Sequence, residues 1–410
     1  MVKQKKIPKL RFPEFEGVWE KKTVGELGVF TGGGTPDTAI AKYWQGNIPW
    51  ISSSDIQEDT VQEYLTSRFI TEEAIKKSAT KIVPKNSVLI VSRVGIGKFA
   101  VSKSPVCTSQ DFTSLTPLVD NPYFLAYYFK EKTNLFFRFS QGTSIKGFTG
   151  TDIRNMVFKV PSLSEQQKIA SFFTAIDQKI SQLKRKKTLL EQYKKGVMQK
   201  IFSQEIRFKD DNGQEFPKWE EKKLGNIGKT YNGLTGKSKD DFGHGKPYIQ
   251  YKQVFDDSRI DITRFDFVRI RDGEKQCRVK YGDVFFTTSS ETPDEVGTSS
   301  VLLDEVGEVY LNSFCFGYRS SPKVLIPMFS RYLFRNELLR KEINKLSQGS
   351  TRYNMSKNEL MKTVIELPSI QEQTKIANFL SAIDVKINHT QKQIEKAEVW
   401  KKGLMQQMFV

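Results

Sequence analysis

The glycine-rich segment Val94-Gly-Ile-Gly-Lys98 contains residue types that bind the phosphate groups of nucleotides. A complete phosphate loop reads Gly-x-x-x-x-Gly-Lys-Ser/Thr and opens a helix. Here Phe99 follows the lysine and β-type sequence flanks the glycines, which predicts a hairpin. We therefore reject nucleotide binding and favour a hairpin that carries Arg93 and Lys98 to the phosphate backbone of a nucleic acid.

A second segment, Asn121-Pro-Tyr-Phe124, resembles the Asn-Pro-Pro-Tyr/Phe loop of adenine methyltransferases but lacks its second proline. Its counterpart later in the chain, Ile326-Pro-Met-Phe329, has no asparagine. The two segments share a proline at the first position of a predicted helix. Sequence typical of an S-adenosylmethionine site, a nuclease or a helicase is not found, and no Ser/His/Asp or Cys/His arrangement is indicated. We expect no catalytic residue in this chain.

Polar and cationic side chains in predicted turns and at strand ends remain as candidates for contacting nucleic acid. Amides, hydroxyls and arginines can bond base edges, and cations bind phosphates. The segments 140–146 and 347–353 both begin Ser-Gln-Gly and are predicted to be loops after helices; an ordinary helix-capping turn explains them equally well. The candidates are Ser52, Ser53, Ser54, Arg93, Lys98, Gln141, Thr143, Ser144, Lys146, Gln250, Lys252, Gln253, Thr287, Thr288, Gln348, Ser350, Thr351, Arg352 and Tyr353.

The charge of the chain favours a polyanionic partner. Lys and Arg number 64 against 47 Asp and Glu, so the net charge is +17. Nucleic acid is the usual partner of such an excess, although a basic protein without one is the alternative. The three cysteines lie far apart and the two histidines are isolated, so neither disulfides nor a metal site are expected, which suits a reducing cytoplasm. No signal peptide or membrane span is predicted.

The two halves of the chain repeat each other, and this repeat organises the molecule. Residues 161–177 return as residues 368–384, at an offset of 207 positions (368 minus 161), and the match runs without a gap from 140/347 to 202/409. The sequences beginning at Trp19 and Trp219 also match, and Arg11-Phe12 parallels Arg207-Phe208. A duplicated chain builds two similar modules with pseudo-twofold symmetry, which DNA shares.

Two long helices are predicted at equivalent places in the repeat. Apolar residues recur at alternating three- and four-residue steps, as in a coiled-coil seam, with gaps at Lys187, Lys194 and Thr390. The seam residues are Ile169, Phe173, Ile176, Ile180, Ile376, Leu380, Ile383 and Ile387. Helices of roughly 38 residues extend roughly 57 Å, and we expect them to pack antiparallel on each other. The alternative is that each helix packs on its own body.

The rest of each repeat forms a body of short β-type runs, with helices that begin at Pro122 and Pro327. We predict an α+β protein in which two mixed α/β domains are joined by the two long helices as an antiparallel coiled coil. The boundaries are a linker at 1–18, a first domain at 19–160, a first spacer helix at 161–205, a linker at 206–218, a second domain at 219–367 and a second spacer helix at 368–410.

This organisation closely resembles the specificity subunit of type I restriction–modification enzymes. Two divergent bodies each end in Ser-Gln-Gly, followed by Pro-Ser-x-x-Glu-Gln-x-Lys-Ile-Ala-x-Phe-hydrophobic-x-Ala-Ile-Asp, and the likeness covers essentially the whole chain. The helix motif maps onto residues 161–202 and 368–409. The resemblance implies that each body is a target recognition domain that reads half of a bipartite DNA site. It also implies that the helices space these domains and dock two modification subunits.

The resemblance further implies that the chemistry belongs to partner subunits. Modification subunits bind S-adenosylmethionine and methylate adenine, and restriction subunits add translocation and cleavage that need ATP and Mg. No cofactor is expected in this chain. The base-reading residues of the family do not map by motif, so the candidates above rest on residue type and position alone.

We interpret the chain as a non-catalytic, cytoplasmic DNA-recognition subunit. Because the bodies differ, its two half-sites should differ, and a helix pair of this length suits half-sites about one helical turn, near 34 Å, apart. Apolar residues at Phe172, Leu189, Trp400 and Leu404 favour partner docking, although a core role explains them equally well. The alternative function is a stand-alone DNA-binding scaffold or repressor with tandem recognition domains.

Overall fold

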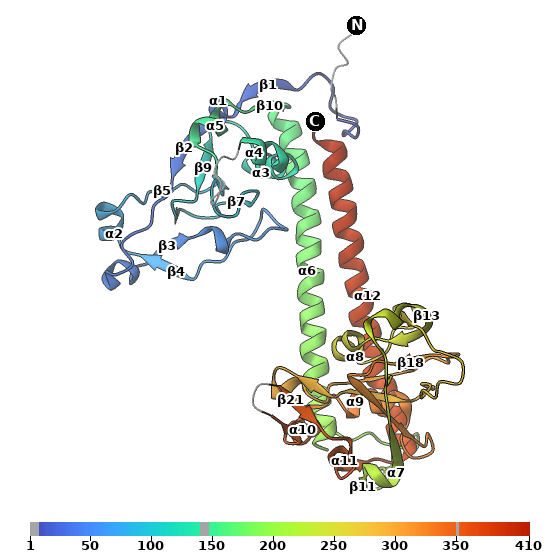
Figure 1. Cartoon of the computed structure of the whole chain (residues 1–410). Coiled ribbons are helices and arrows are strands. Elements are labelled where there is room, and N and C mark those ends of the chain that lie inside the picture. Colours follow the sequence, from blue (N-terminus) through green and yellow to red (C-terminus); the bar gives the residue numbers. More distant parts are fainter. Residues whose placement is uncertain (1–7, 140–146, 350–351) are drawn as a thin grey trace. The chain divides into compact units, whose positions relative to one another are not determined.

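The computed structural model describes residues 8–139, 147–349 and 352–410 (Figure 1). The chain forms two compact units: unit 1 comprises residues 1–186 with 390–410, and unit 2 comprises residues 187–389. Each unit contains one body and part of both long helices, α6 (Leu163–Phe202) and α12 (Ile370–Met408). The compact units therefore differ from the linear division into bodies and helices that the sequence indicates.

Unit 1 consists of small sheets covered by short helices. Its elements before α6 are β1 (Glu20–Thr23), α1 (Val24–Leu27), β2 (Gly28–Gly32), η1 (Ala41–Trp44), β3 (Ile48–Ile51), η2 (Ser53–Asp55), β4 (Arg68–Ile70), α2 (Glu72–Lys77), β5 (Ile82–Val83), β6 (Val88–Ile90), β7 (Phe99–Val101), β8 (Val106–Thr108), β9 (Thr113–Pro117), α3 (Pro122–Glu131), α4 (Thr133–Phe139), α5 (Gly150–Asn155) and β10 (Val157–Val160).

Unit 2 repeats much of this order. Its elements between the long helices are β11 (Glu220–Lys223), α7 (Leu224–Ile227), β12 (Gly228–Asn232), η3 (Lys239–Asp241), β13 (Phe242–Ile249), α8 (Tyr251–Asp256), β14 (Asp266–Val268), β15 (Val284–Thr287), β16 (Ser289–Ser290), η4 (Pro293–Glu295), β17 (Ser299–Val301), β18 (Tyr310–Leu311), β19 (Cys315–Ser320), α9 (Pro327–Leu333), α10 (Glu337–Asn344), β20 (Ser347–Gln348), β21 (Tyr353–Met355), α11 (Lys357–Leu360) and β22 (Val364–Leu367).

The sheets of the two bodies have equivalent topology. Unit 1 has the strand orders β2-β9-β6-β7 and β4-β3-β8-β5, and unit 2 has β12-β19-β15-β17 and β14-β13-β18. In both, one parallel pair, β3 with β8 and β13 with β18, lies among antiparallel pairs. A two-stranded ladder closes each body, pairing Glu20 with Val160 and Glu220 with Leu367 just before each long helix. Unit 2 also contains a small sheet, β16-β21-β20.

The predicted body helices begin at the two prolines. Asn121 caps α3 by accepting a hydrogen bond from Phe124 N at 3.0 Å, and Pro122 occupies the first turn, where its missing N–H costs nothing. α9 also has a proline, Pro327, in its first turn, but its N-cap residue Ile326 makes no side-chain cap hydrogen bond. Both helices bury most of their side chains against the sheets, so the prediction of these helices is confirmed.

Each long helix packs both on a body and on the other long helix. In the core of unit 1, Phe409 near the end of α12 stacks on Tyr128 of α3 and Phe173 of α6, with ring centres 5.1 and 5.7 Å apart. In unit 2 the equivalent Phe202 contacts Trp219 and Phe329. The coiled-coil prediction and its alternative, packing on the body, are therefore both realised. The predicted seam residues are buried except Ile387, which is partly buried.

Of two predicted turns, the structure confirms one and contradicts the other. Residues 91–98 form the expected hairpin between β6 and β7, where Gly95 and Gly97 both take φ near +96°, a conformation that favours glycine. The segment 347–353 was predicted to be a loop, but its described residues form the strand β20 and the start of β21, which pair with each other. Backbone pairing with the neighbouring β16 stabilises this hairpin, and a local reading of the sequence could not detect that partner.

Candidate nucleic-acid interface

The glutamate of the repeated motif fixes the N-terminal segment to the first long helix. Glu165, whose side chain is 1% exposed, accepts hydrogen bonds from Arg11 Nε at 2.8 Å, Arg11 Nη2 at 2.7 Å and Trp19 Nε1 at 3.3 Å. Arg11 also donates to Gly17 O at 2.7 Å. A buried carboxylate requires such a paired cation and full hydrogen bonding. The residues expected to be a linker are therefore anchored within unit 1.

Unit 2 contains the same cluster. Glu372, with a fully buried side chain, accepts hydrogen bonds from Arg207 Nε at 3.2 Å, Arg207 Nη2 at 2.7 Å and Trp219 Nε1 at 3.2 Å. Arg207 also donates to Pro217 O at 2.6 Å. The repeated Arg, Trp and Glu therefore have one structural role in both halves of the chain.

The glutamine that follows each of these glutamates connects a long helix to a body helix. Gln166 Oε1 accepts a hydrogen bond from Asn121 N at 2.9 Å, and its Nε2 donates to Pro161 O at 3.0 Å. Gln373 Oε1 accepts from Ile326 N at 2.9 Å in unit 2. Each amide thus satisfies a backbone group at the start of α3 or α9.

The aspartate at the end of the motif pairs with a lysine of the other long helix. In unit 1, Asp177 accepts a hydrogen bond from Tyr127 Oη at 2.7 Å and lies 2.5 Å from Lys401 Nζ. The side chains of Asp177 and Lys401 are 5% and 8% exposed. Burial, with the charge of Asp177 adding to it, raises the pKa of Tyr127, so its hydroxyl remains a donor.

Unit 2 repeats this arrangement at positions related by the offset of the repeat. Asp384 accepts from Tyr332 Oη at 2.8 Å and lies 2.6 Å from Lys194 Nζ, while Arg331 Nη1 approaches to 3.1 Å. The predicted seam gap at Lys194 is therefore the place where an ion pair joins the two helices. The glutamate, the first glutamine and the aspartate of the motif therefore have partners inside the protein in both units.

The serine candidates of unit 1 lie on and beside η2. Ser52 Oγ accepts a hydrogen bond from Arg68 Nη2 at 2.7 Å and bonds Asp55 Oδ2 at 3.0 Å, so it belongs to an internal cluster. The Arg68 guanidinium lies over the Trp50 ring, 4.6 Å from its centre. Ser53 is half-buried and Ser54 is exposed, which leaves Ser54 as the most accessible of the three.

Two cationic candidates of unit 1, Arg93 and Lys98, lie on the glycine hairpin. Arg93 is exposed. Lys98 is more enclosed, with a 20% exposed side chain whose Nζ lies 3.8 Å from Glu58. The hairpin therefore presents Arg93 more openly than Lys98 to a phosphate backbone.

Two candidates of unit 2 do not belong to an accessible surface. Gln253 is 1% exposed; its Oε1 accepts from Asp261 N at 2.9 Å and its Nε2 donates to Arg264 O at 3.1 Å. Thr287 is fully buried and accepts from Thr298 N at 3.1 Å. Their hydrogen bonds hold the body together, and we remove both residues from the candidate set.

The other described candidates of unit 2 gather near α8 and β16. Gln250 precedes α8 and donates to Asp266 Oδ2 at 3.0 Å, whereas Lys252 is exposed on α8 and pairs with Asp256 at 3.0 Å. Thr288 Oγ1 donates to Phe314 O at 2.8 Å. Gln348 and Arg352 are exposed and Tyr353 is half-buried on the β20–β21 hairpin, which pairs with β16. Gln141, Thr143, Ser144, Lys146, Ser350 and Thr351 lie outside the described residues.

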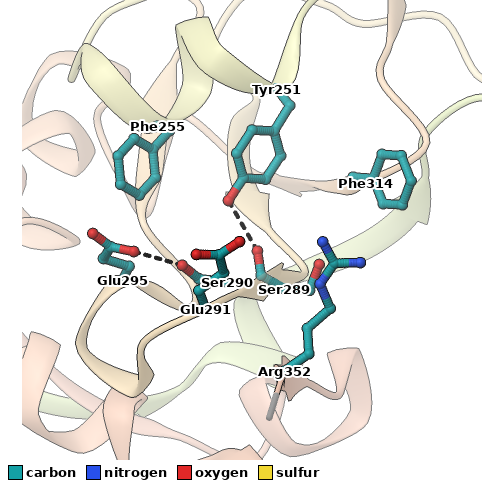
Figure 2. Close-up of a pocket in the computed structure, with 8 residues that line it drawn as sticks. All are labelled: Tyr251, Phe255, Ser289, Ser290, Glu291, Glu295, Phe314 and Arg352. Carbon is teal, nitrogen blue, oxygen red and sulfur yellow. Dashed lines mark hydrogen bonds between the residues drawn. The ribbon is translucent and has the colours of Figure 1, made fainter. Parts of the chain in front are cut away.

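A pocket of about 420 Å³ lies among these unit 2 residues (Figure 2). Tyr251 and Phe255 of α8 form one wall with parallel rings 6.1 Å apart, and Phe314 forms another. Ser289, Ser290, Glu291 and Glu295 supply the polar lining, and Arg352 reaches it from the β20–β21 hairpin. The volume lies in the range of ligand sites, roughly 300–1,000 Å³.

The sequence indicated only Arg352 among the residues that line this pocket. The others come from α8, the segment after β15 and the residue before β19, and no short motif connects these segments. Phe314 gives no clear sign in the sequence, where it lies between Ser313 and Cys315. Its role becomes visible only in the structure, which leaves the side chain 58% exposed.

The described residues show neither a metal-ligand cluster nor a membrane-spanning helix. No group of three or more His, Cys, Asp or Glu side chains among residues 8–139, 147–349 and 352–410 is arranged to hold a metal ion. Within the same residues, no helix has the length and apolar character required to cross a membrane.

Comparison with known proteins connects both repeats to one family. The family model described as "Type I restriction modification DNA specificity domain" matches residues 16–192 and again residues 217–399. The MjaIX type I restriction enzyme specificity subunit of Methanocaldococcus jannaschii is 27% identical over 394 residues, which cover 92% of this chain and 89% of that protein. The EcoR124I/EcoR124II specificity subunit of Escherichia coli is 32% identical over 179 residues, 41% of this chain and 43% of that one.

Solved structures have the same fold. The S subunit of a type I restriction-modification system from M. genitalium superposes with a TM-score of 0.60 at 15% identity, over 98% of this chain and 99% of that one. A chain from a structure of complex assembly and conformational transition in a type I R-M system gives a TM-score of 0.58 at 18% identity, over 95% and 96% of the two chains. The arrangement of two bodies with two long helices is therefore a known one.

Proposed function

This chain belongs to the family of type I restriction–modification DNA specificity subunits, and from this premise we propose that it selects the DNA sequence on which a modification and restriction complex acts. Each body reads one half of a bipartite site, and the duplex is held through phosphate contacts that the net charge of +17 favours. The complex acts in the cytoplasm in this proposal.

One observation carries this proposal: equivalent anchoring clusters support two bodies that differ in structure. Glu165 and Glu372 each accept from an arginine and a tryptophan, and Asp177 and Asp384 each accept from a tyrosine and pair with a lysine of the other long helix, with Arg331 as an additional cation at Asp384. The bodies they support differ directly after equivalent strands, since the short turn η2 follows β3 in unit 1 whereas the helix α8 follows β13 in unit 2. A constant frame with two different reading surfaces suits a site made of two different halves.

The long helices supply a second function, the docking of two modification subunits. Trp400 and Tyr193 occupy equivalent positions in the repeat and are both 54% exposed. Each has an exposed aliphatic neighbour, Val399 at 73% and Leu189 at 54%. Exposed aromatic residues of this kind are typical anchors of protein interfaces. Two equivalent anchors fit two copies of one partner.

The partners supply the catalysis in this proposal. Modification subunits carry S-adenosylmethionine and methylate adenine, and restriction subunits use ATP and Mg. This chain contributes sequence recognition and assembly. Phe172 and Leu404, which the sequence also offered for docking, pack partly buried against the core of unit 1 and are left out of the docking surface.

The test is a genome-wide map of methylated adenine. A host that expresses this chain with its modification subunit is compared with a host that expresses the modification subunit alone. We expect a new asymmetric bipartite motif that depends on this chain. Assembly of the complex without any new methylation would instead indicate a scaffold or repressor and would refute the proposal.

A further inference from the structure

We propose that the unit 2 pocket is a base-reading site, which takes the exocyclic amino group of an adenine or a cytosine at the edge of a base pair. This inference rests on the proposed function and gives it a chemical detail: which body reads this base pair, and with which side chains. The pocket is lined by Tyr251 and Phe255 of α8, by residues of β16 and the segment after it, by Phe314 and by Arg352 (Figure 2).

The charged groups around the pocket are available to a ligand. Within the part of the chain that the structure describes, Glu291, Glu295 and Arg352 form no ion pair, although many other charged residues of unit 2 do. Glu295 Oε2 accepts a hydrogen bond from Ser290 Oγ at 2.6 Å. That bond orients the carboxylate of Glu295 and leaves its other oxygen to accept a second donor.

Carboxylates on a surface that binds a polyanion require a specific reason. They repel phosphates, and a site built for phosphate gathers lysines and arginines instead. In the major groove of double-stranded DNA, the groove that distinguishes all four base pairs, the amino groups of cytosine N4 and adenine N6 are the donors presented to a carboxylate. Two unpaired glutamates beside one arginine therefore favour a base edge over a phosphate.

The aromatic walls match the same ligand. Phe314 is held by its backbone, since its carbonyl accepts from Thr288 N at 2.9 Å and from Thr288 Oγ1 at 2.8 Å, yet its ring is 58% exposed. Tyr251 Oη donates to Ser289 O at 2.9 Å, which fixes the ring on the opposite wall. Fixed apolar surfaces exclude water from hydrogen bonds between them and contact the flat or methylated edges of bases.

Arg352 extends the site toward the next group on the DNA. Its position on the β20–β21 hairpin places a cation beside the two carboxylates without neutralising either one within the described residues. An arginine in this setting bonds a guanine edge or a phosphate adjoining the base that the glutamates contact.

The experiment combines protein variants with the methylation map. Glu291→Gln, Glu295→Gln and Phe314→Ala are each expressed with the modification subunit, and the methylated motif is compared with that of the unchanged chain. In each variant, the preference for the correct base over the other bases should fall roughly 5- to 150-fold at one position of one half-site. This is the range expected for a lost base contact. The other half-site should stay unchanged.

Two matched controls separate this effect from damage to the fold. Phe267→Ala removes a 46% exposed phenylalanine and Glu305→Gln alters an exposed carboxylate, both in unit 2 and outside the pocket lining. Both control variants should leave the motif intact. An unchanged motif in all three pocket variants, or an equal loss at both half-sites, overturns the inference while the proposed function stands. Absence of any motif with the unchanged chain refutes the proposed function itself.

A purified complex gives an independent readout. At the position identified by the map, the adenine or cytosine is replaced by an analogue that lacks the exocyclic amino group. This replacement should weaken binding by the unchanged complex and have little further effect on the Glu291→Gln or Glu295→Gln complex that contacts the amino group. Equal losses for the unchanged complex and both glutamine variants would show that neither carboxylate contacts the amino group and would overturn the inference.

Discussion

Asp177 and Asp384 occupy one position of the repeat but are buried to different extents. The Asp177–Lys401 pair of unit 1 has side chains 5% and 8% exposed, whereas the Asp384–Lys194 pair of unit 2 has side chains 12% and 22% exposed. Arg331 gives Asp384 a second cation at 3.1 Å. The two equivalent sites therefore differ both in burial and in the number of cations that face the carboxylate.

Asp177→Ala should destabilise the protein by about 3–5 kcal/mol, because it leaves the charge of Lys401 buried without a partner. Asp384→Ala should cost less, since Lys194 is more exposed to water. Urea denaturation of the two variants measures both values. Combining Asp177→Asn with Lys401→Met should recover most of the loss, and Glu191→Ala, from an exposed pair, should cost at most about 1 kcal/mol. Equal losses at Asp177 and Glu191 would contradict this account.

We predict that the contribution of Lys130 of α3 to stability rises with pH. Burial, reinforced by the nearby charge of Lys401, lowers the pKa of Lys130 to about 8, despite the opposing Asp59, Asp177 and Glu58. Between this value and the ordinary 10.5, the unfolded chain binds more protons than the folded one, so stability contributed by this group rises with pH. Well below pH 8 the cost of keeping this partly buried ammonium group charged is fully present.

Lys130→Met should therefore stabilise the protein at pH 7, and the gain should shrink as the pH approaches 10.5. Denaturant unfolding of the variant and the unchanged protein at pH 7 and pH 10 provides the comparison. The exposed Lys81 offers a control, since Lys81→Met should have a small effect at either pH. A gain that grows with pH would reverse the sign and refute the assignment.

At the scale of elements, we predict that the long helices dock modification subunits through Trp400 and Tyr193. Loss of a buried aromatic anchor weakens an interface by about 2 kcal/mol or more, close to 30-fold in affinity. Trp400→Ala and Tyr193→Ala should each reduce the number of bound modification subunits from two to one at limiting concentration. Native mass spectrometry of the assembled complex counts the copies.

A control variant and a double variant complete that experiment. Leu65→Ala removes a 59% exposed leucine from the body of unit 1 and should retain both partner subunits. The variant with both aromatic residues replaced should bind neither. Two partner subunits on the double variant would show that docking uses another face of the helices.

The elements differ in how well the sequence predicted them. The long helices follow from a seam of apolar residues that continues over many turns, and α3 and α9 follow from prolines at their starts, so local pattern was sufficient. The strands of the bodies are mostly three to five residues long, and β6, β7 and β8 are buried throughout, so alternation could not reveal their pairing. The parallel pair β3 with β8 depends on residues far apart in the chain.

The candidate site could be predicted only in part, because burial and long-range contacts cannot be read from local sequence. Gln253 and Thr287 are polar residues in suitable positions, yet burial, which the sequence does not reveal, assigns them to the core. Arg352 was found by residue type. Tyr251, Glu291, Glu295 and Phe314 converge only through the tertiary fold, and the motif glutamates and aspartates look equally available in the sequence until their buried partners are known.

At the scale of the whole molecule, the net charge of +17 predicts that DNA binding depends steeply on salt. A complex that makes about 6–10 phosphate contacts should lose roughly 10³- to 10⁵-fold in affinity between 50 and 200 mM salt. Fluorescence anisotropy with labelled DNA measures the slope. Arg93→Gln should reduce the slope by about 1, and Arg93→Lys should preserve it. Affinity that barely changes over this range would contradict an electrostatic hold on the backbone.

The composition of unit 1 has a consequence for the synthesis of the chain. Its core includes Met405, Met408 and Phe409, so its last residues leave the ribosome only after the whole of residues 187–389. At roughly 5–20 residues per second, the roughly 200 intervening residues delay completion of this core by roughly 10–40 s. Unit 2 is continuous in sequence and can fold during that interval. The body encoded first is therefore the one that matures last, and until then Tyr128 and Phe173 lack the aromatic ring that stacks between them and remain exposed to chaperones and to aggregation.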